Sequence, residues 1–282
     1  MHYRTILPNP QLAKHVECFW LLESRGQPRE VAPERIMPDG CIELIFNLAD
    51  PFKRYHANGV IETQPQTLVA GQMRSYALIE PTGRVKLFGV RFHPGGAFPF
   101  LRFPVCELTD SIINFENVLS RLGKELAEKV QRARSSRERI AVIEAAFLAR
   151  LTQFEAADQL IDTVVNLMVR RNGLISIERL QQHSNLSGRQ LERRFQSQVG
   201  LTPKFFCRIL RFQKVFKAAA QPQKVNWSCI AAECGYYDQA HFIHDFKAFS
   251  GQNPSAYFSE DHALSEYFTR KHRLSDFYNT NE

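Results

Sequence analysis

Short apolar runs separated by turn residues dominate the first 110 residues. The runs include CIELIFNL at 41–48, TLVAG at 67–71 and VKLFGVRF at 85–92, and the segments between them contain PDG, NG and PTG. Apolar runs of this length, bounded by glycine and proline, are typical of β-strands. Their spacing favours an antiparallel sheet, as a barrel or a sandwich, over βαβ units.

The pattern changes between about Ser111 and Phe154, where apolar residues recur three and four positions apart. LSRLGKELAEKVQ at 119–131 and RERIAVIEAAFLARL at 137–151 show this spacing, which predicts two amphipathic helices. These helices could join the two halves of the chain or pair with a second copy of it. The first half is therefore expected to be a β-rich domain followed by helices, and the fold class is α+β.

After Asp158 the chain is expected to be helical, which predicts an all-α C-terminal domain with two helix-turn-helix units. The segment LIDTVVNLMVR at 160–170 precedes Asn172-Gly173, a pair typical of a helix C-terminus. With 282 residues the chain is long enough for two domains, and its apolar fraction of 44% can fill their cores. The predicted boundaries are 1–155 for the β-rich domain, 158–260 for the helical domain and 261–282 for a partly helical tail.

An internal repeat organises the helical region. The stretch LERRFQSQVGLTPKFF at 191–206 aligns with FIHDFKAFSGQNPSAY at 242–257 at a constant offset of 51 residues. The matched pairs are Leu191 with Phe242, Phe195 with Phe246, Gly200 with Gly251, Pro203 with Pro254, and Phe206 with Tyr257. Any two helical hairpins share some of these features, but this many matches in register favour a true repeat.

Matched helix caps support the repeat. Ser187 and Asp238 hold equivalent positions before the second helix of each unit, and both residue types are preferred N-caps. Ser187 and Gln190 also have the form of a capping box. Thr202-Pro203 and Asn253-Pro254 each place a cap residue before proline at the first position of a further helix.

Upstream of these caps the offset becomes 50, so that Ser176 matches Asn226 and Leu180 matches Ile230. The one-residue difference falls in the turns, which contain NL in the first unit and GYY in the second. Each unit is thus a short helix, a tight turn, a second helix (here called the reading helix) and a glycine stop. This is the plan of a helix-turn-helix, whose second helix can lie in the major groove of DNA.

Positive charge is concentrated in the first unit. Residues 170–224 contain 12 Lys and Arg but only two acids, whereas residues 1–155 contain 20 Lys and Arg against 17 Asp and Glu. This density of charge favours a polyanionic partner, with nucleic acid first and an anionic membrane surface second. A solvated helix face is the simpler alternative.

The sequence gives no indication of a membrane or secreted protein. It has no run of about 18 apolar residues, and its first twenty residues lack the apolar segment and cleavage site of a secretory signal. The six cysteines are scattered without a CxxC pair, as is usual for reduced thiols. We therefore expect a cytoplasmic protein without membrane contact.

The second unit, WSCIAAECGYYDQAHFIHDFKAFSGQNPSAY at 227–257, resembles the most diagnostic stretch of the AraC/XylS family of bacterial transcriptional regulators. The matching residues are Ile230, Ala231, Gly235, Tyr236, Asp238, Phe242, Phe246, Lys247, Gly251, Pro254 and Tyr257. The first unit matches through Leu180, Ser187, Leu191, Arg194, Phe195, Gly200, Pro203 and Arg211. It departs from the family at Gln181, where a small alanine is usual.

The resemblance spans about residues 158–260 and implies a sequence-specific transcriptional regulator, expected to be an activator that binds double-stranded promoter DNA and contacts RNA polymerase. The first half resembles a less well-defined domain found ahead of such regions, through IMPDGCIELIFNL at 36–48 and FGVRFHPGGAF at 88–98. In the family, the N-terminal domain usually senses a small molecule or mediates dimerisation. The resemblance thus implies a small-molecule effector or a homodimer here.

Four polar residues of these two N-terminal stretches are candidate effector ligands: Asp39, Glu43, Arg91 and His93. They could point into a cavity of the β-rich domain. Equally, Asp39-Gly40 could be only a turn, with Glu43 and Arg91 on the polar face of a strand.

The first reading helix should bury Leu191 and Phe195, which follow helical spacing. The candidates for DNA contact are the polar residues Arg189, Gln190, Glu192, Arg193 and Gln196. Arginine can bind guanine with two hydrogen bonds, and glutamate can accept one from cytosine. Each could instead contact a phosphate or be an ordinary surface residue.

The second reading helix should bury Phe242, Phe246 and Phe249. The outward candidates are Gln239, Ala240, Ile243, His244 and Lys247. This face has few groups that can form paired hydrogen bonds with a base. We therefore expect the first helix to supply most direct base discrimination, and the second to add phosphate, apolar and shape contacts.

The same unit contains two cysteines followed by two histidines: Cys229, Cys234, His241 and His244. A zinc finger places its second pair about twelve residues after the first, with three to five residues between the histidines. Here six residues separate the pairs and two separate the histidines. The stretch is better explained as the turn and reading helix of the second unit, and we expect no metal.

No P-loop, GxSxG, HExxH or GxGxxG motif occurs, so we expect neither a common catalytic centre nor a cofactor. The alternative from the enzyme class is a DNA-repair alkyl-transfer protein that uses the helix-turn-helix region for targeting, as in proteins fused to this family. Such chemistry needs a cluster of reactive cysteines, whereas Cys18, Cys41 and Cys106 are isolated in the sequence.

Overall fold

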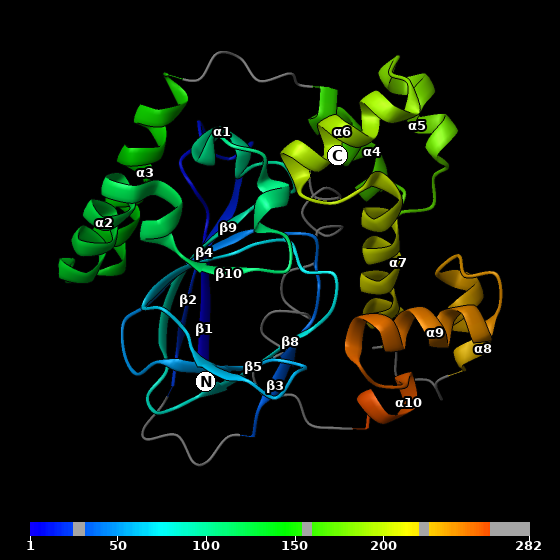
Figure 1. Cartoon of the computed structure of the whole chain (residues 1–282), viewed down its shortest axis with the longest axis horizontal. Coiled ribbons are helices and arrows are strands. Elements are labelled where there is room, and N and C mark those ends of the chain that lie inside the picture. Colours follow the sequence, from blue (N-terminus) through cyan, green and yellow to red (C-terminus); the bar gives the residue numbers. More distant parts are fainter. Residues whose placement is uncertain (25–31, 154–159, 220–225, 260–282) are drawn as a thin grey trace.

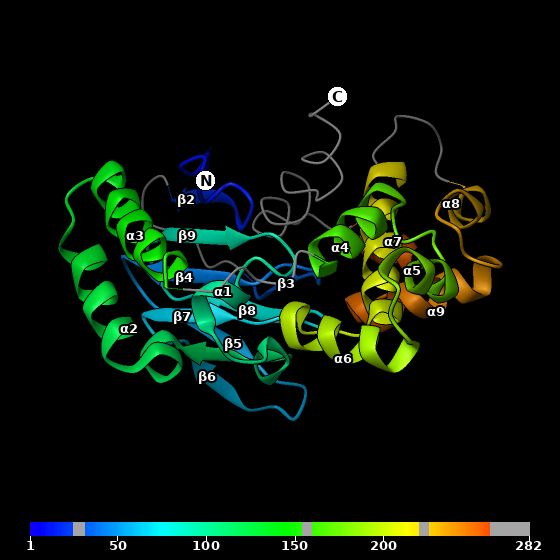
Figure 2. The same cartoon turned by 90° about the horizontal axis from the view of Figure 1, so that it is seen from above.

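The computed structural model describes residues 1–24, 32–153, 160–219 and 226–259. In Figure 1 the sheets lie in the middle, with α2 (Phe115–Arg132) and α3 (Ser136–Leu151) on one side and the helices of residues 160–257 on the other. Figure 2 shows the same order from above. We call residues 1–153 the N-terminal part and residues 160–259 the C-terminal part. The predicted tail lies outside the described residues.

The larger sheet has six antiparallel strands in the order β1-β2-β9-β4-β7-β10. The strands are β1 (His2–Ile6), β2 (Val16–Glu23), β9 (Lys86–Phe92), β4 (Glu43–Asn47), β7 (Thr67–Ala70) and β10 (Ile112–Asn114). Both of its faces are covered, and alternate residues of a strand therefore belong to different cores. Phe19 packs in the core beneath α2 and α3, whereas its neighbour Trp20 packs towards the second sheet.

The second sheet has four antiparallel strands in the order β3-β8-β5-β6. They are β3 (Glu34–Ile36), β8 (Ala77–Pro81), β5 (Phe52–Tyr55) and β6 (Ile61–Thr63). Phe52 of this sheet shares a core with Trp20 and Leu87 of the larger one. The expected β-rich domain is confirmed, and it consists of two sheets that share an apolar core.

The two helices expected after the sheets are also present. Asn114 caps α2 by accepting a hydrogen bond from the Glu116 backbone N–H, and Ser135 caps α3 in the same way through Glu138. The α2 helix is kinked at Ser120, whose φ is 47°. A short helix α1 (Phe98–Leu101) and a 3-10 turn η1 (Val105–Leu108) connect the larger sheet to this pair.

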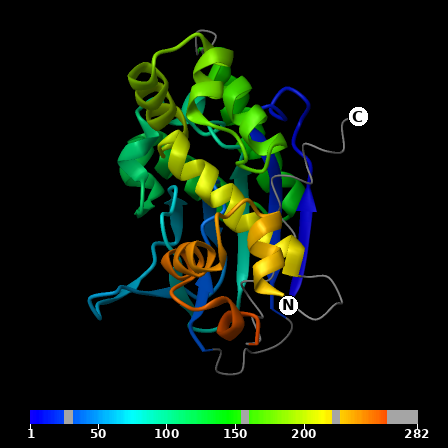
Figure 3. The ribbon, with the colours of Figure 1, turned by 90° about the vertical axis from the view of Figure 1, so that its right-hand side faces the viewer.

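The C-terminal part contains two helix-turn-helix units joined by α7 (Pro203–Ala219). The helix α4 (Leu160–Arg170) precedes the first unit, α5 (Ile177–Ser184) and α6 (Gly188–Val199). The second unit is α8 (Trp227–Glu233) and α9 (Gln239–Ser250), followed by α10 (Pro254–Tyr257). Figure 1 places the units at opposite ends of α7, and Figure 3 shows α7 in yellow crossing this face of the molecule. The reading helices are α6 and α9.

The caps follow the repeat. Ser187 and Asp238 accept hydrogen bonds from the third residue of α6 and α9, and Ser187 with Gln190 completes the predicted capping box. Gly200 and Gly251 end the two helices with φ of 95° and 74°, a conformation that glycine adopts without strain. Asn253 holds the cap position of α10, but its side chain makes no capping hydrogen bond.

The departure at Gln181 is accommodated by a glycine on the neighbouring helix. A Cβ atom at Gly188, the first residue of α6, would lie only 2.5 Å from the Gln181 amide nitrogen. The absence of a side chain at residue 188 therefore leaves room for the longer one at residue 181.

The apolar core of the C-terminal part extends across the boundary between the two parts. It includes Leu191 and Phe195 of α6 and Phe242 and Phe246 of α9, all fully buried, as predicted. Two further members, Met37 and Cys41, come from the N-terminal part. None of the described helices has the length and apolar character needed to cross a membrane.

Candidate nucleic-acid interface and N-terminal cavity

The α6 helix presents a polar face opposite its buried stripe. Arg189, Glu192 and Arg193 are exposed, and Gln196 is half-buried beside them. Leu191 and Phe195 anchor the other side of the helix at 0% exposure, so the polar residues are held on a rigid element. Two guanidinium groups and one carboxylate on this face can form the directional hydrogen bonds that distinguish bases in a major groove.

Gln190 is exposed as predicted, but part of its side chain is already used. Its Oε1 accepts hydrogen bonds from the backbone N–H of Ser187 and from the Ser187 hydroxyl, each at 3.0 Å. Only the Gln190 amide N–H groups remain for a base or a phosphate. The structure thus shows Gln190 as part of the helix cap.

The outward face of α9 carries less hydrogen-bonding chemistry. Gln239, Ala240, His244 and Lys247 are exposed, whereas Ile243 is half-buried against the core. The Gln239 Oε1 atom accepts a hydrogen bond of 2.6 Å from the Ser228 hydroxyl of α8. Lys247, His244 and the amide N–H groups of Gln239 are left as polar groups on this face.

Several basic residues of α7 hold the second unit in place. Arg208 binds the buried Asp245 of α9 through two hydrogen bonds, of 2.8 and 3.2 Å. Arg211 lies over the Tyr236 ring, and the Lys214 ammonium donates to the Glu233 carbonyl. The high charge of residues 170–224 thus serves two purposes: some of it fixes α8 and α9, while other charges, such as Arg189 and Arg193, face solvent.

The cysteines and histidines of the second unit occupy separate environments. Cys234 ends α8 and is buried, which raises the pKa of its thiol to about 12, whereas Cys229 is exposed. The N–H of Tyr237 donates to His241 Nδ1 at 3.5 Å, and Asp238 caps the same turn. Within residues 1–24, 32–153, 160–219 and 226–259, no three His, Cys, Asp or Glu side chains form a metal-binding group.

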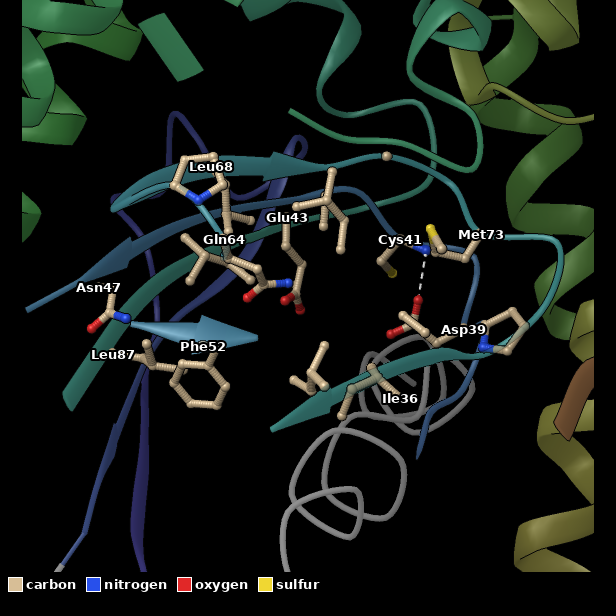
Figure 4. Close-up of a pocket in the computed structure, with 18 of the residues that line it drawn as sticks. Ile36, Asp39, Cys41, Glu43, Asn47, Phe52, Gln64, Leu68, Met73 and Leu87 are labelled. Atoms are coloured by element: carbon tan, nitrogen blue, oxygen red, sulfur yellow. Dashed lines mark hydrogen bonds between the residues drawn. The ribbon is translucent and has the colours of Figure 1, made fainter. Parts of the chain in front are cut away.

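The N-terminal part contains a cavity of about 100 Å³ between the two sheets. Figure 4 shows its lining, which is mostly apolar and includes Ile36, Phe52 and Leu87. Of the four predicted effector ligands, Asp39 and Glu43 line this cavity. Gln64 also lines it, although no sequence motif marked this residue. Arg91 and His93 are not among the lining residues.

Arg91 is fully buried and is surrounded by carboxylates. Its Nη1 is 2.7 Å from Glu43 Oε1, its Nη2 is 2.6 Å from Asp39 Oδ2, and its Nε is 3.0 Å from Glu17 Oε2. Glu43 is the direct cross-strand neighbour of Arg91 in the β4–β9 pair. Glu17 lies at an irregularity in the pairing of β2 with β9, where an extra residue can redirect a side chain.

Burial dominates the protonation of this cluster. It raises the pKa of Glu43 to about 7 and also raises that of Glu17, although Arg91 opposes both shifts. Burial and the nearby Arg91 charge lower the pKa of His93 to about 4, so this histidine is neutral at physiological pH. Glu17 was absent from the predicted site, but a glutamate among the apolar residues of β2 (Val16–Glu23) is a recognisable sign of a buried ion pair.

The segment beside the cavity also contacts the C-terminal part. Gln213 of α7 donates a hydrogen bond of 2.5 Å to the Pro38 carbonyl, next to the cavity residue Asp39. Gln72 donates to the Gly40 carbonyl at 2.7 Å, and its side chain packs against Gly200 at the end of α6. The loop of residues 37–41 is thus in contact with both the cavity and the helix-turn-helix region.

The two parts of the chain match different family models. Residues 180–260 match a family described as "Helix-turn-helix domain". Residues 4–114 match one described as a domain of unknown function, DUF6597. No curated protein matches the chain.

The chain is also similar, at low identity, to solved structures of ToxT from Vibrio cholerae. For ToxT of strain O395 the identity is 11% and the TM-score 0.45, over 85% of this chain and 97% of ToxT. For an apo ToxT variant of strain SCE256 the values are 12% and 0.44, over 86% and 97%. For wild-type ToxT of that strain with a bound unsaturated fatty acid they are 13% and 0.41, over 84% and 94%. At TM-scores below 0.5, no residue role or ligand is transferred from ToxT to this chain.

Proposed function

We propose that this DNA-binding transcriptional regulator, which carries an AraC/XylS-type helix-turn-helix domain, holds specific promoter DNA with both α6 and α9. The observation that carries the proposal is the pair of equivalent, identically terminated reading helices, each with a buried apolar stripe and an exposed outer face. Two such helices in one chain suit successive major grooves on one side of the duplex, about one helical turn apart.

The two helices have different tasks in this proposal. The α6 helix makes most of the direct contacts with bases, through Arg189 and Arg193 first and through Glu192 and Gln196 second. The α9 helix adds phosphate contacts through Lys247 and His244, and apolar contacts through Ala240 and Ile243. The exposed positions of the two arginines and of Lys247 support this division.

The N-terminal part, with a proposed boundary near residue 155, senses a small molecule in the cavity between its sheets. The loop of residues 37–41 supports a route for the signal, because Asp39 and Cys41 line the cavity while Met37 and Cys41 pack in the C-terminal core. A molecule that moves this loop changes the support of α7 through the Pro38 carbonyl. Activation through RNA polymerase, a homodimer and a cytoplasmic location are proposed from the family resemblance.

The alternative alkyl-transfer enzyme is disfavoured by the state of two of its cysteines. Alkyl transfer needs a thiolate, and therefore a thiol whose pKa is ordinary or lowered. Burial raises the pKa of both the Cys18 and the Cys41 thiols well above the ordinary value. Cys106 is exposed, but it lies in η1 and does not share a cluster with Cys41. It therefore does not form the group of reactive cysteines that alkyl transfer needs.

A gel-shift series with upstream regions of the genome that encodes the chain tests the proposed function. The full chain should shift at least one region in preference to others, and the affinity should fall steeply with salt because phosphate contacts release counterions. A matched chain with Arg189→Ala and Arg193→Ala should lose the preference while keeping salt-sensitive, non-specific binding. If no region is bound with sequence preference at any salt concentration, the proposed function is wrong.

A further inference from the structure

The Glu43 carboxyl group lies at the cavity, and one of its two oxygens is bonded to Arg91. Glu43 is only 8% exposed, and its Oε1 accepts a hydrogen bond of 2.7 Å from Arg91. No described residue donates a hydrogen bond to its Oε2. Glu43 and Gln64 both line the cavity, and Figure 4 labels both side chains. A carboxylate oxygen can accept further hydrogen bonds, so Oε2 can accept one from a donor in the cavity.

The charges around this oxygen favour a positive donor. Arg91 carries one positive charge, whereas Glu17, Asp39 and Glu43 together carry three negative charges when ionised. The Asp39 carboxylate is fully engaged, because its second oxygen accepts the Cys41 backbone N–H at 3.0 Å. No Lys, Arg or His is present among the described residues that line the cavity. Burial disfavours the ionised forms of Glu17 and Glu43, and a second cation would compensate the negative charge that they carry when ionised.

The remainder of the cavity is suited to an apolar body. Ile36 and Ile79 come from the smaller sheet, while Leu68 and Leu87 come from the larger one. At about 100 Å³ it is somewhat smaller than a cavity of about 150 Å³ that holds one benzene molecule. It also opens to solvent on one side, so it suits a single ring or a short alkyl chain whose end can project outwards.

We propose that the cavity binds a small apolar amine, whose ammonium group donates hydrogen bonds to Glu43 Oε2 and Gln64 Oε1. The inference rests on the proposed sensing role and specifies the chemical class of the effector. An anionic ligand is excluded, because its carboxylate would add a further negative charge beside Glu43 and Asp39 without a free cation to oppose it. An alcohol can donate one hydrogen bond to Glu43 but leaves the charge uncompensated.

Three probes that share one ring test this chemistry: benzylamine, benzyl alcohol and benzoate. Their binding to the full chain is measured by calorimetry and by thermal shift at about pH 8, where Glu43, with a pKa of about 7, is ionised. Benzylamine should bind at least about tenfold more tightly than benzyl alcohol, and benzoate should not bind.

Two variants locate the binding. Glu43→Gln keeps an acceptor for Arg91 but removes the charge, so the preference for benzylamine over benzyl alcohol should disappear. Glu62→Gln, at an exposed glutamate of β6, is the matched control and should retain that preference. Ala77→Leu fills the cavity from β8 without changing any charge, and should abolish the binding of both neutral and cationic probes.

The inference is overturned if benzoate binds as tightly as benzylamine, if no probe binds, or if Glu43→Gln retains the amine preference. Operator binding is measured in the same preparations by gel shift. A chain that shifts DNA but does not prefer the amine removes only this inference. A chain that prefers the amine but shows no sequence-preferring DNA binding removes the proposed function and leaves the amine site.

Discussion

Arg91 is the residue on which the electrostatics of the N-terminal part depend. It is completely buried, and each nitrogen of its guanidinium group lies within 3.0 Å of a different carboxylate. Moving such a group out of water is costly, and the three nearby carboxylates offset part of that cost. The arginine therefore holds three segments together: the strands β2 and β4 and the loop of residues 37–41.

Replacing Arg91 by methionine should strongly destabilise the N-terminal part. The side chains have similar length, but the substitution leaves Glu17, Asp39 and Glu43 buried without a cation. Breaking a buried ion pair in this way typically costs about 3–5 kcal/mol in the free energy of unfolding. The loss is measured by urea denaturation at neutral pH.

The matched control is Arg84→Met, at an exposed arginine that precedes the same strand, β9. Its effect on the unfolding free energy should stay within about 0.5 kcal/mol. Equal destabilisation by the two substitutions would show that the ion cluster makes no specific contribution to the free energy of unfolding.

The raised pKa of Glu43 gives the fold a pH dependence with a definite sign. Its pKa is about 7 in the folded chain against an ordinary 4.5, so between these values the folded state binds more protons than the unfolded state. Stability should therefore fall as pH rises from about 5 to about 7. The groups that face Glu43 are Arg91 on β9, Glu17 and Cys18 on β2, and Asp39 and Cys41 on the loop.

The measurement is urea unfolding at several pH values in that window, for the wild type and for Glu43→Gln. One proton changes the slope by at most about 1.4 kcal/mol per pH unit. The variant should show a shallower fall than the wild type, with a remaining slope from Glu17, whose pKa is raised in the same direction. Parallel curves would contradict the shift at Glu43.

At this scale the sequence predicted the identities of important residues better than their roles. Asp39, Glu43 and Arg91 were candidates because they are polar residues in two distinctive stretches, and two of them do line the cavity. Arg91 instead forms ion pairs with the acids. These pairs depend on the pairing of β4 with β9 and on the irregularity at Glu17. Strand register over nearly fifty residues is not encoded in a local pattern.

At the scale of single elements, the reading helices are alike in their framework and different in their outer faces. Both begin at a capping side chain and end at a glycine with positive φ. The α6 face carries Arg189 and Arg193, whereas the only basic side chain with a permanent charge on the α9 face is Lys247. Since guanidinium groups form paired hydrogen bonds with guanine and an ammonium group does not, the two helices should differ in specificity.

Arg193→Ala should reduce operator affinity by about 1–3 kcal/mol and relax the preference at one base pair. His244→Ala should change affinity by less than about 1 kcal/mol, equally for all sequences, because the contact proposed for it is with the DNA backbone. Both are measured by gel shift with a set of single-base operator variants. The opposite outcome, in which only His244→Ala abolishes the preference, would show that α9 is the discriminating helix.

Arg121→Ala provides the control for charge alone. Arg121 lies on α2, far along the chain from either unit, and its side chain is 92% exposed. Its removal changes the net charge by the same amount as Arg193→Ala. Operator affinity and base preference should both remain at wild-type values if the effect of Arg193 is local.

The helices were predictable because their determinants lie within a few residues of one another. The caps at Ser187 and Asp238, the glycine stops and the apolar spacing all act over one or two turns, and each is present in the structure. The order β1-β2-β9-β4-β7-β10 was not predictable, since it brings together strands that are distant in the chain. Apolar runs indicate that a strand exists but do not identify its neighbours.

At the scale of the whole molecule, the N-terminal part contacts both reading helices at equivalent ends. The Thr109 hydroxyl donates a hydrogen bond of 2.6 Å to the Gly200 carbonyl, at the end of α6. The Tyr76 backbone N–H donates one of 2.8 Å to the Phe249 carbonyl, and its ring packs against Gly251 at the end of α9. These contacts fix the position of each reading helix relative to the sheets, which no local sequence pattern could predict.

Thr109→Val should loosen the C-terminal end of α6, because it removes the hydroxyl while keeping the side-chain shape. A lost hydrogen bond of this kind costs about 1 kcal/mol, so amide hydrogen exchange at Val199 and Gly200 should become roughly fivefold faster. Thr82→Val is the matched control, since its hydroxyl donates an equivalent 2.6 Å bond within the N-terminal part, to the Pro51 carbonyl. The same acceleration in both variants would contradict a specific contact.

The loop of residues 37–41 also limits how this protein can be taken apart and recombined. Met37 and Cys41 fill space in the core of the helices that follow, although more than a hundred residues separate them from those helices in the chain. A chimaera that joins this DNA-binding region to a foreign sensor at residue 158 would leave a hole where the two side chains belong. A successful exchange of sensors would have to transfer the loop together with the helices. The segment needed for a stable DNA-binding region is therefore larger than residues 160–259 alone.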